Sequence, residues 1–216
     1  MNCKICTDPT NSRTHPTLFT KYHICPNCGF ISKDEVFHLS DKDEFSLYEL
    51  HENSIEDENY VKFFEDFLQK AVFPFISIGR SALDFGSGPS PVLAQLMERD
   101  YGYDYTIYDK FYAPDTSYKN NTYDLITSTE VMEHVADPLP VFSELKDLLA
   151  DDGLLAIMTL FAPDTKDNFF GWHYLRDQTH VSIFTLTAME IIADQVGLEI
   201  IYSDNKRYTT FKKTAF

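Results

Sequence analysis

Long hydrophobic runs, basic residues and a signal sequence are all scarce or absent in this 216-residue chain. No uninterrupted run of about 18 apolar residues occurs, so we expect no membrane-spanning helix. Only 18 lysines and arginines stand against 34 aspartates and glutamates, giving a formal net charge of −16. Because so acidic a chain repels a phosphate backbone, nucleic-acid binding is not expected. No apolar signal-peptide region follows Met1, so we expect a cytoplasmic protein.

Cysteine is absent after residue 28, and the four cysteines form two C-x2-C pairs, Cys3 with Cys6 and Cys25 with Cys28, separated by an 18-residue spacer. This spacing is typical of tetrahedral zinc sites, because each pair presents two thiolates to one ion. So short a segment cannot build a hydrophobic core, and bound metal would supply the folding energy. We therefore predict a zinc-ribbon-like module over residues 1–38, with Zn²⁺ in a structural role.

Two other interpretations of the cysteines are disfavoured. A pair of disulfides does not suit a reducing cytoplasm. A redox C-x-x-C site is disfavoured because neither pair lies in a βαβ context. With four thiolates present, the nearby His15, His23 and His38 are expected to be packing or surface residues rather than metal ligands.

An acidic linker and an amphipathic helix are expected over residues 39–76. The polar run 40–44 predicts a solvated linker. From Asp57, apolar residues recur at helical spacing until Pro74, which predicts an amphipathic helix. This helix can either pack on the following domain or close over a site as a lid. The residues just before it that are candidates for lining a pocket are Tyr48, His51, Glu52 and Asn53.

Residues 81–91 organise the rest of the sequence, as an apolar strand, a glycine turn and the start of a helix. Gly86 and Gly88 allow positive φ and remove the Cβ atoms that would block a ligand. Asp84 places a carboxylate at the carboxyl end of the strand, where open α/β sheets bind ligands. The pattern predicts a ligand site, although such a turn can also serve only to pack a strand against a helix.

Predicted strands alternate with predicted helices over residues 77–216, which is typical of a parallel sheet. Strands are predicted over 81–85, 103–108, 123–127 and 154–160, and an antiparallel hairpin over 198–211. Thr187 and Glu190 predict a capping box for the last helix. Asp109, at a strand end beyond the glycine turn, can bind the two hydroxyls of a ribose. The predicted fold class is α/β, a Rossmann-like and mostly parallel sheet with a terminal antiparallel hairpin, preceded by the zinc-binding module.

The order of these motifs resembles that of the class I S-adenosylmethionine-dependent methyltransferases. The resemblance covers residues 81–216 and rests on the glycine turn, Asp109, Tyr-Asp-Leu-Ile at 123–126, Glu-His-Val at 133–135 and the terminal hairpin. It implies S-adenosylmethionine as cofactor and methyl transfer as reaction. The cysteine module is loosely similar to modules of some sugar C-methyltransferases and ribosomal RNA methyltransferases.

Carried over by position, the resemblance implies two sets of site residues. The cofactor-binding set is Asp84, Gly86, Gly88, Asp109 and Thr129. Glu130 is expected to face the methyl-transfer site. Ser90 replaces the third glycine of the family's turn. The connection between Asp109 and Asp124 is short for the family, so its third strand is expected to be vestigial around 117–120, and the adenine contacts are left unassigned.

Methyl transfer is an in-line displacement, so the enzyme mainly aligns and desolvates the nucleophile. A general base is needed only where the nucleophile loses a proton. The candidate catalytic residues are His180, Glu130 and His173, with His134 a weaker candidate. His180 is favoured because it lies where the long loop 161–184 meets the last helix, although it can also serve only to brace that loop.

The acceptor is expected to be a small molecule or a sugar. Two alternatives stay open: an RNA or protein methyltransferase that uses the zinc module for recognition, and a non-catalytic relative that binds the cofactor. The acidic composition argues against RNA. The intact Asp84, Gly86, Gly88 and Asp109 argue against loss of the cofactor site.

Overall fold

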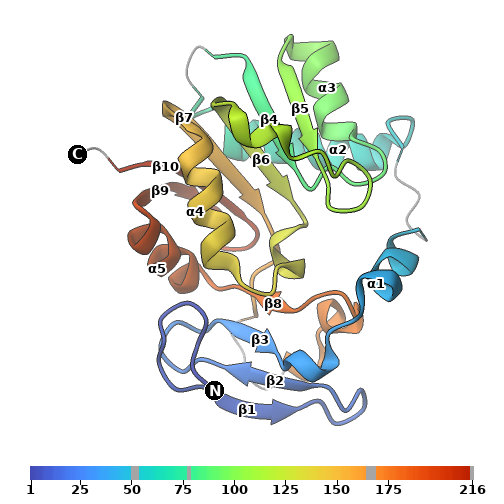
Figure 1. Ribbon diagram of the computed structural model, residues 1–216, viewed down its shortest axis with the longest axis vertical. Coiled ribbons are helices and arrows are strands. Elements are labelled where there is room, and N and C mark those ends of the chain that lie inside the picture. Colours follow the sequence, from blue (N-terminus) through green and yellow to red (C-terminus); the bar gives the residue numbers. More distant parts are fainter. Residues whose placement is uncertain (50–53, 77–78, 164–168, 215–216) are drawn as a thin grey trace.

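The computed structural model describes residues 1–49, 54–76, 79–163 and 169–214, which form a six-stranded sheet and a smaller four-stranded sheet (Figure 1). The large sheet has the order β5 (Asp104–Tyr108), β4 (Ser81–Phe85), β6 (Tyr123–Thr129), β7 (Leu149–Met158), β10 (Tyr208–Lys213) and β9 (Leu198–Ser203). The first four strands pair in parallel, and β10 runs antiparallel to both β7 and β9. The predicted α/β fold with a mostly parallel sheet and a terminal hairpin is confirmed.

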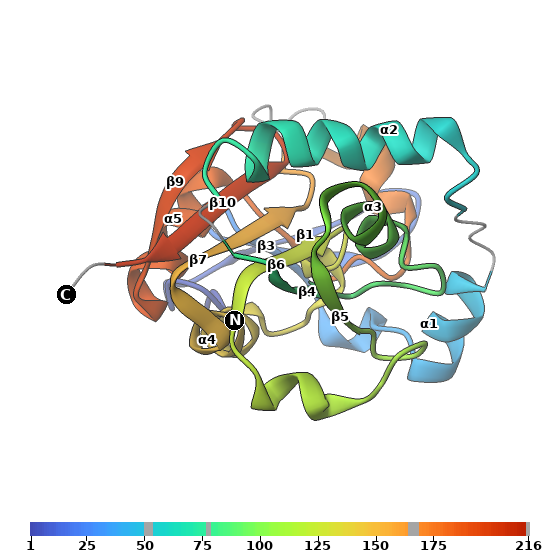
Figure 2. The same cartoon turned by 90° about the horizontal axis from the view of Figure 1, so that it is seen from above.

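Helices cover both faces of the large sheet, as Figure 2 shows from above. On one face lie α2 (Glu58–Phe67) and α3 (Val92–Tyr101), and on the other α4 (Pro138–Leu148) and α5 (Leu186–Val196). Successive strand residues point to opposite faces, so Ala82 packs with the first pair of helices and Leu83 with the second. The central strands are apolar on both faces because both are buried.

The acidic run predicted as a solvated linker is instead the helix α1 (Asp41–Tyr48), so that prediction is wrong. The Ser40 hydroxyl accepts a hydrogen bond from the Asp43 amide at 3.2 Å, which caps the first turn. The acidic side chains of this turn also stabilise the helix, because they lie at the positive end of its dipole. Lys110 then ties α1 to the loop after β5 through ion pairs with Asp41 and Glu44.

Three further local predictions need correction. Residues 117–120 are no strand but part of the 3₁₀-helix η3 (Thr116–Asn120), because the Asp115 side chain caps a helical turn there and the sheet ends at β5. The cap of α5 is Thr185 rather than Thr187, since the Thr185 hydroxyl accepts from the Ala188 amide at 3.1 Å. Strand β7 begins at Leu149, earlier than predicted, because Leu149 already pairs with Tyr123 across a register shift.

The small sheet consists of β1 (Asn11–Thr14), β2 (Lys21–Ile24), β3 (Ile31–Lys33) and β8 (Ser182–Ile183). Because β8 comes from the long loop before α5, the N-terminal ribbon is joined to the body of the protein by a sheet. Short helical segments complete the described chain: η1 (Glu35–Phe37), the π-helical η2 (Leu68–Val72), η4 (Met132–His134), η5 (Phe169–Gly171) and η6 (His173–Arg176). Within the described ranges, no helix has the length and apolar character that crossing a membrane requires.

Candidate functional site

A cavity of about 820 Å³ opens at the carboxyl ends of β4, β5 and β6, where the glycine turn predicts a ligand site. Helices α1 and α2 supply aromatic walls through Tyr48, Tyr60 and Phe63. The volume suits a small-molecule ligand or two ligands side by side. The amphipathic helix α2 thus packs on the sheet through Phe64 and Phe67 and also lines the cavity.

One side of the cavity, here called the glycine end, is formed by Asp84, Gly86, Ser87, Gly88 and Asp109. Gly86 and Gly88 both have positive φ, 87° and 66°. A Cβ atom on Gly86 would collide with the Val131 side chain, whereas one on Gly88 would meet no atom within 4 Å. Gly86 is therefore required for packing, and Gly88 leaves a bare stretch of backbone that a ligand can approach.

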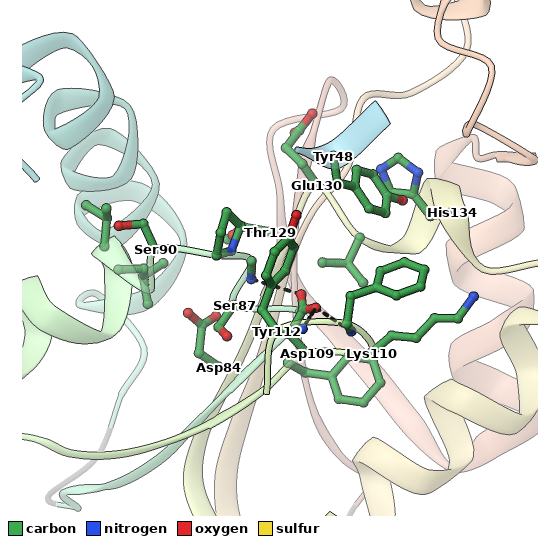
Figure 3. Close-up of a pocket in the computed structure, with 18 of the residues that line it drawn as sticks. Tyr48, Asp84, Ser87, Ser90, Asp109, Lys110, Tyr112, Thr129, Glu130 and His134 are labelled. Carbon is green, nitrogen blue, oxygen red and sulfur yellow. Dashed lines mark hydrogen bonds between the residues drawn. The ribbon is translucent and has the colours of Figure 1, made fainter. Parts of the chain in front are cut away.

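Asp109 is the centre of the glycine end (Figure 3). Its Oδ2 accepts a hydrogen bond from the Gly88 amide at 2.9 Å. Its Oδ1 accepts from the amides of Phe111 and Tyr112 at 2.8 and 3.0 Å. These bonds fix a tight turn after β5 that brings Phe111 and Tyr112 to the cavity wall, so the short connection still contributes aromatic surface.

Asp84 lies at the floor of this end and is only 2% exposed. Thr127 donates to its Oδ1 at 3.3 Å. Burial, with a smaller contribution from the charge of Asp109, raises the pKa of the Asp84 carboxyl to about 7. Ser87 Oγ is buried beside it without a hydrogen-bond partner among the described residues. The glycine end therefore holds polar groups that a bound molecule can satisfy.

The opposite side, here called the histidine end, is formed by Glu130, Glu133, His134, Asp177 and His180. Glu130 has φ 55°, a left-handed conformation that is costly for a residue with a side chain. Its Oε1 is buried and has no partner within the described part of the chain. Burial, reinforced by the charge of Glu133, raises the pKa of Glu130 to about 8. A buried carboxyl with a raised pKa, on a residue whose backbone is strained, is typical of functional sites.

His180 is held by the loop before β8. Its Nδ1 lies 2.8 Å from the backbone carbonyl oxygen of Tyr174, and its Nε2 lies 3.6 Å from Asp177 Oδ2. Its ring packs edge-on against that of His134, with ring centroids 4.9 Å apart. Burial, followed by the nearby His134, lowers the pKa of His180 below its usual value, so its imidazole is neutral at pH 7.

The predicted site residues that line this one cavity are Asp84, Gly86, Gly88, Asp109, Thr129, Glu130 and His180. His173 is instead exposed on η6 and is not among the described lining residues. Tyr48 lines the cavity and contacts His134 (Figure 3). His51, Glu52 and Asn53 lie outside the described residues. Sequence reasoning missed Glu133 and Asp177, although Glu133 directly precedes a histidine after a strand end.

Acidic side chains dominate the cavity. Seven acidic residues are among its described lining residues, against the single lysine Lys110, and raised pKa values leave two of them, Asp84 and Glu130, partly protonated near pH 7: Glu44, Asp57, Asp84, Asp109, Glu130, Glu133 and Asp177. Lys110 is already paired with two acids of α1. Such a lining favours neutral or cationic ligands over anions.

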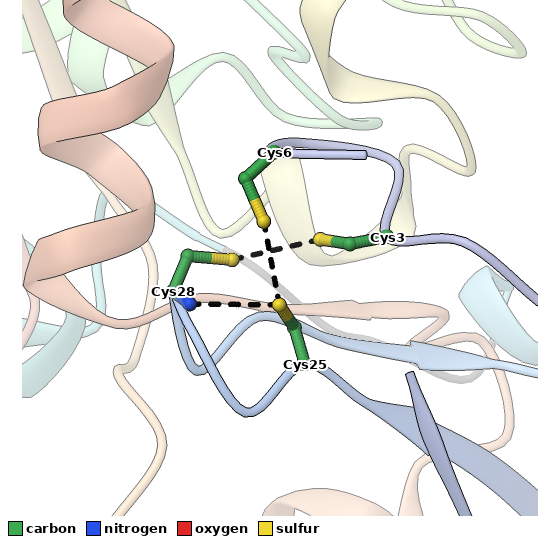
Figure 4. A group of neighbouring side chains, drawn as sticks. All are labelled: Cys3, Cys6, Cys25 and Cys28. Carbon is green, nitrogen blue, oxygen red and sulfur yellow. Dashed lines mark hydrogen bonds between the residues drawn. The ribbon is translucent and has the colours of Figure 1, made fainter. Parts of the chain in front are cut away.

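The four cysteine thiols converge at the N-terminal ribbon (Figure 4). Their Sγ atoms lie within 4.8 Å of one another, with Cys3 and Cys28 3.5 Å apart and Cys6 and Cys25 3.4 Å apart, and all four are free. Four sulfurs about 2.3 Å from one zinc ion lie about 3.8 Å from each other. The cluster therefore fits a tetrahedral zinc ion.

The three nearby histidines each have a partner elsewhere. His15 Nε2 lies 2.9 Å from the Phe170 carbonyl oxygen, His23 Nε2 lies 3.0 Å from Asp34 Oδ2, and His38 Nε2 lies 3.2 Å from the Lys33 carbonyl oxygen. All three serve packing and hydrogen bonding, as expected from the sequence.

The ribbon also braces the histidine end. The Val181 amide donates to the Glu133 carbonyl at 2.8 Å, and the Lys33 amide of β3 donates to the Val181 carbonyl at 2.9 Å. Further bonds between the ribbon and the body run from Lys4 Nζ to the Ala136 carbonyl, from Thr185 Oγ1 to the Cys28 carbonyl and from Gln195 Nε2 to the Ile5 carbonyl. The segments that carry Glu133, His134 and His180 are thus fixed by the cysteine-rich module.

Comparison with known proteins agrees with this geometry. Residues 57–203 match a sequence family described as a methyltransferase domain. The structure of the mitomycin 7-O-methyltransferase MmcR superposes with a TM-score of 0.54 at 11% identity, over 79% of this chain and 60% of that one. An O-methyltransferase family protein from Burkholderia thailandensis gives 0.56 at 11% identity, over 80% and 63%.

This chain thus spans less than two thirds of the length of either structural neighbour. At this identity the likeness shows a shared fold. No curated protein matches the sequence. The family match covers residues 57–203, more than half of the chain, and includes every strand that forms the glycine end. The chain therefore belongs to the methyltransferase-domain family.

Proposed function

We propose that this protein is an S-adenosylmethionine-dependent methyltransferase that acts on a small molecule or sugar. The observation that carries the proposal is that one cavity contains both ends. The glycine end has a carboxylate of the kind that binds ribose, and the histidine end has a buried carboxyl and two imidazoles. Membership of the methyltransferase-domain family supports methyl transfer as the reaction.

The glycine end fits the cofactor. Gly88 exposes backbone with no Cβ in the way, and beside it Asp109 Oδ2, which accepts the Gly88 amide alone among the described donors, keeps a lone pair for a ribose hydroxyl. Phe111 and Tyr112 provide aromatic surface for adenine. The acidic lining favours a positively charged sulfonium. S-adenosylmethionine supplies the methyl group when bound there, and Asp84, Gly86 and Thr129 complete its surroundings.

The histidine end then receives the acceptor. We assign Glu130 the role of general base, because its buried carboxyl lines this end of the cavity and its Oε1 accepts no hydrogen bond from a described donor group. His180 donates from Nδ1 to the Tyr174 carbonyl oxygen, which leaves the lone pair of Nε2 available, and it is the second candidate base. Tyr48 and Tyr60 form apolar walls that exclude water from the nucleophile. The excess of carboxylates supports an acceptor that is neutral or cationic rather than RNA.

The cysteine cluster is proposed to hold a structural Zn²⁺. Its contacts with residues 133–136 and 181–185 support a role in shaping the acceptor side of the cavity. In this proposal, the module acts on the reaction through the protein body rather than by recognising a macromolecule.

Calorimetric titration of the zinc-loaded protein with S-adenosylmethionine and S-adenosylhomocysteine tests the cofactor. We expect micromolar binding that Asp109→Ala weakens by about 10–100-fold, the effect of losing a charge-assisted hydrogen bond. Asp115→Ala, an exposed acid in the same loop, is the matched control and should bind normally. Absence of binding to the wild-type protein would contradict the proposal. Release of S-adenosylhomocysteine with a panel of neutral and amine-bearing hydroxylated compounds then identifies the acceptor.

A further inference from the structure

The histidine end contains a second group of metal-ligating side chains, separate from the cysteines. Glu133, His134 and His180 each offer a ligand atom, and these atoms lie within 4.8 Å of one another. Ligand atoms about 2.1 Å from one ion lie about 3–3.5 Å apart, a distance that small side-chain rotations reach from here. Glu133 and His134 come from η4, and His180 precedes β8, so distant segments converge on one point.

Two of these ligand atoms are left unsatisfied by the protein. Glu133 is fully buried, with 0% exposure, and its Oε2 receives no hydrogen bond from a described N–H or hydroxyl group, while the carboxyl of Glu130 lies beside the Glu133 carboxyl. His134 Nδ1 is buried in the same unpartnered state. Two buried carboxyls side by side and an unpartnered imidazole nitrogen are both unfavourable in the absence of a ligand, and such groups are retained where something binds them.

Tyr174 supports two of the three ligands from behind. Its hydroxyl donates to Glu133 Oε1, which orients the carboxylate and leaves Oε2 for another partner. Its backbone carbonyl oxygen, which can only accept, lies 2.8 Å from His180 Nδ1. The His180 proton is therefore on Nδ1, and Nε2 presents a lone pair. Ligands in metal sites are held by outer hydrogen bonds of this kind.

The charge of the cavity favours a cation at this point. Glu130 and Asp177 lie in the same end as Glu133, and Lys110 is the one lysine among the described lining residues. Two imidazoles and a carboxylate form a donor set typical of first-row transition metals that keep open coordination positions. The ribbon fixes both segments that carry the ligands, so the donor set is preorganised.

We infer that Glu133, His134 and His180 bind a divalent first-row transition-metal ion at the acceptor side of the cavity, with Tyr174 as their supporting residue. The existence of this site does not depend on the reaction. Its use in holding an acceptor oxygen beside Glu130 rests on the proposed methyltransferase function. The assignment makes His180 a metal ligand and leaves Glu130 as the base.

Equilibrium dialysis against Co²⁺ of the full-length protein loaded with one equivalent of zinc per chain, followed by counting both metals by mass spectrometry, tests the site. We expect one zinc and one cobalt per chain. His134→Ala and Glu133→Gln should each keep the zinc and lose the cobalt. Tyr174→Phe should weaken cobalt binding by about 10–100-fold, as loss of an outer hydrogen bond does. His173→Ala, an exposed histidine outside the cavity, is the matched control and should bind both metals.

The outcomes separate this site from the proposed function. The proposed site would be overturned if cobalt bound only in exchange for the zinc of the cysteine cluster. It would also be overturned if both His134→Ala and Glu133→Gln still bound cobalt. Because His134 is only partly buried, its alanine variant should fold, and a thermal unfolding curve checks this. Titration with S-adenosylmethionine is run on the same samples. Cofactor binding without cobalt binding rejects the metal site alone, and cobalt binding without cofactor binding rejects the proposed function alone.

Discussion

The two ends of the cavity are built in different ways. The glycine end comes from one strand and its turn, residues 84–88, together with Asp109 at the end of the neighbouring parallel strand. The histidine end brings together side chains from the segment after β6, which includes η4, and from the loop before β8, which are far apart in the sequence. The first is fixed by backbone conformation and strand pairing, and the second by tertiary contacts with the cysteine-rich ribbon.

This difference has a consequence for stability. Strand pairing and glycine conformation hold the glycine end wherever the sheet is folded. The histidine end needs a second unit to be in place, because the Val181 amide that bonds the Glu133 carbonyl lies next to β8, which completes the small sheet. Disturbing the ribbon should therefore damage one end and spare the other.

Removal of the proposed zinc ion is the largest expected perturbation. Because structural zinc sites supply the folding energy of small modules, chelation or Cys25→Ser should unfold the ribbon. Hydrogen exchange should then show lost protection at residues 133–136 and 181–185, with protection retained at residues 81–85. Adding zinc back to the chelated protein is the control. Equal loss of protection in all three segments would mean that the two ends are one cooperative unit.

Replacement of the proposed base affects the histidine end alone. Glu130→Gln keeps the size of the side chain but removes its ability to take a proton. We expect kcat to fall by about 10²–10⁴-fold, while S-adenosylmethionine binding stays within twofold of wild type. The rate with the acceptor found by screening tests the fall in kcat, and calorimetric titration tests the binding of S-adenosylmethionine. Glu190→Gln, at an exposed position of α5, is the matched control. An unchanged kcat for Glu130→Gln would rule out Glu130 as the base.

The two glycines of the turn provide a matched pair within the glycine end. Gly86→Ala places a methyl group against Val131 and should lower the free energy of unfolding by about 3 kcal/mol, from overpacking plus the positive φ. Gly88→Ala meets no atom and should lower it by only about 1 kcal/mol. Its methyl group, however, occupies ligand space, so S-adenosylmethionine should bind more weakly. Urea unfolding and calorimetry on both variants measure the difference, and equal affinities for Gly88→Ala and wild type would place the ligand elsewhere.

Asp84 should make the free energy of unfolding depend on pH. Because burial raises its pKa to about 7, folded Asp84 keeps a proton that the unfolded chain releases near pH 4. The free energy of unfolding therefore falls as pH rises from about 4 to about 7. Asp84→Asn removes this loss and should be more stable than wild type by about 4 kcal/mol at pH 8 but equal to it near pH 4. Urea unfolding of both proteins at pH 4 and pH 8 measures the difference in their free energies of unfolding. A difference that is the same at both pH values would contradict a buried, protonated Asp84 carboxyl.

The sequence could predict the glycine end because its chemistry is local. An apolar strand, Gly86 and Gly88 in a turn, and an acid at the next strand end have one compact arrangement in a parallel sheet. The same holds for the cysteines, whose C-x2-C spacing alone brings two thiolates to one ion. The hairpin before the C-terminus also followed from local pattern, and the structure confirms it.

Elements set by competing interactions were harder to predict. The polar run 40–44 looked like a linker, yet Ser40 caps a helix there and Lys110 pairs with its acids. The start of α5 depends on which threonine side chain caps its first turn. The Thr185 hydroxyl accepts a hydrogen bond from the Ala188 amide and donates one to the Cys28 carbonyl of the ribbon. His173 and His180 are similar in sequence context, but only His180 lies in the cavity.

The sequence by itself thus determined the sheet, the glycine turn and the cysteine cluster, because each is specified by residues close along the chain or by strand order. Only the tertiary structure decided that Glu133, His134 and His180 meet, and that the ribbon fixes them there. The physical reason is that this end has no backbone pattern of its own. Its geometry is set by hydrogen bonds and packing between segments separated by tens to more than a hundred residues, which local propensity does not encode.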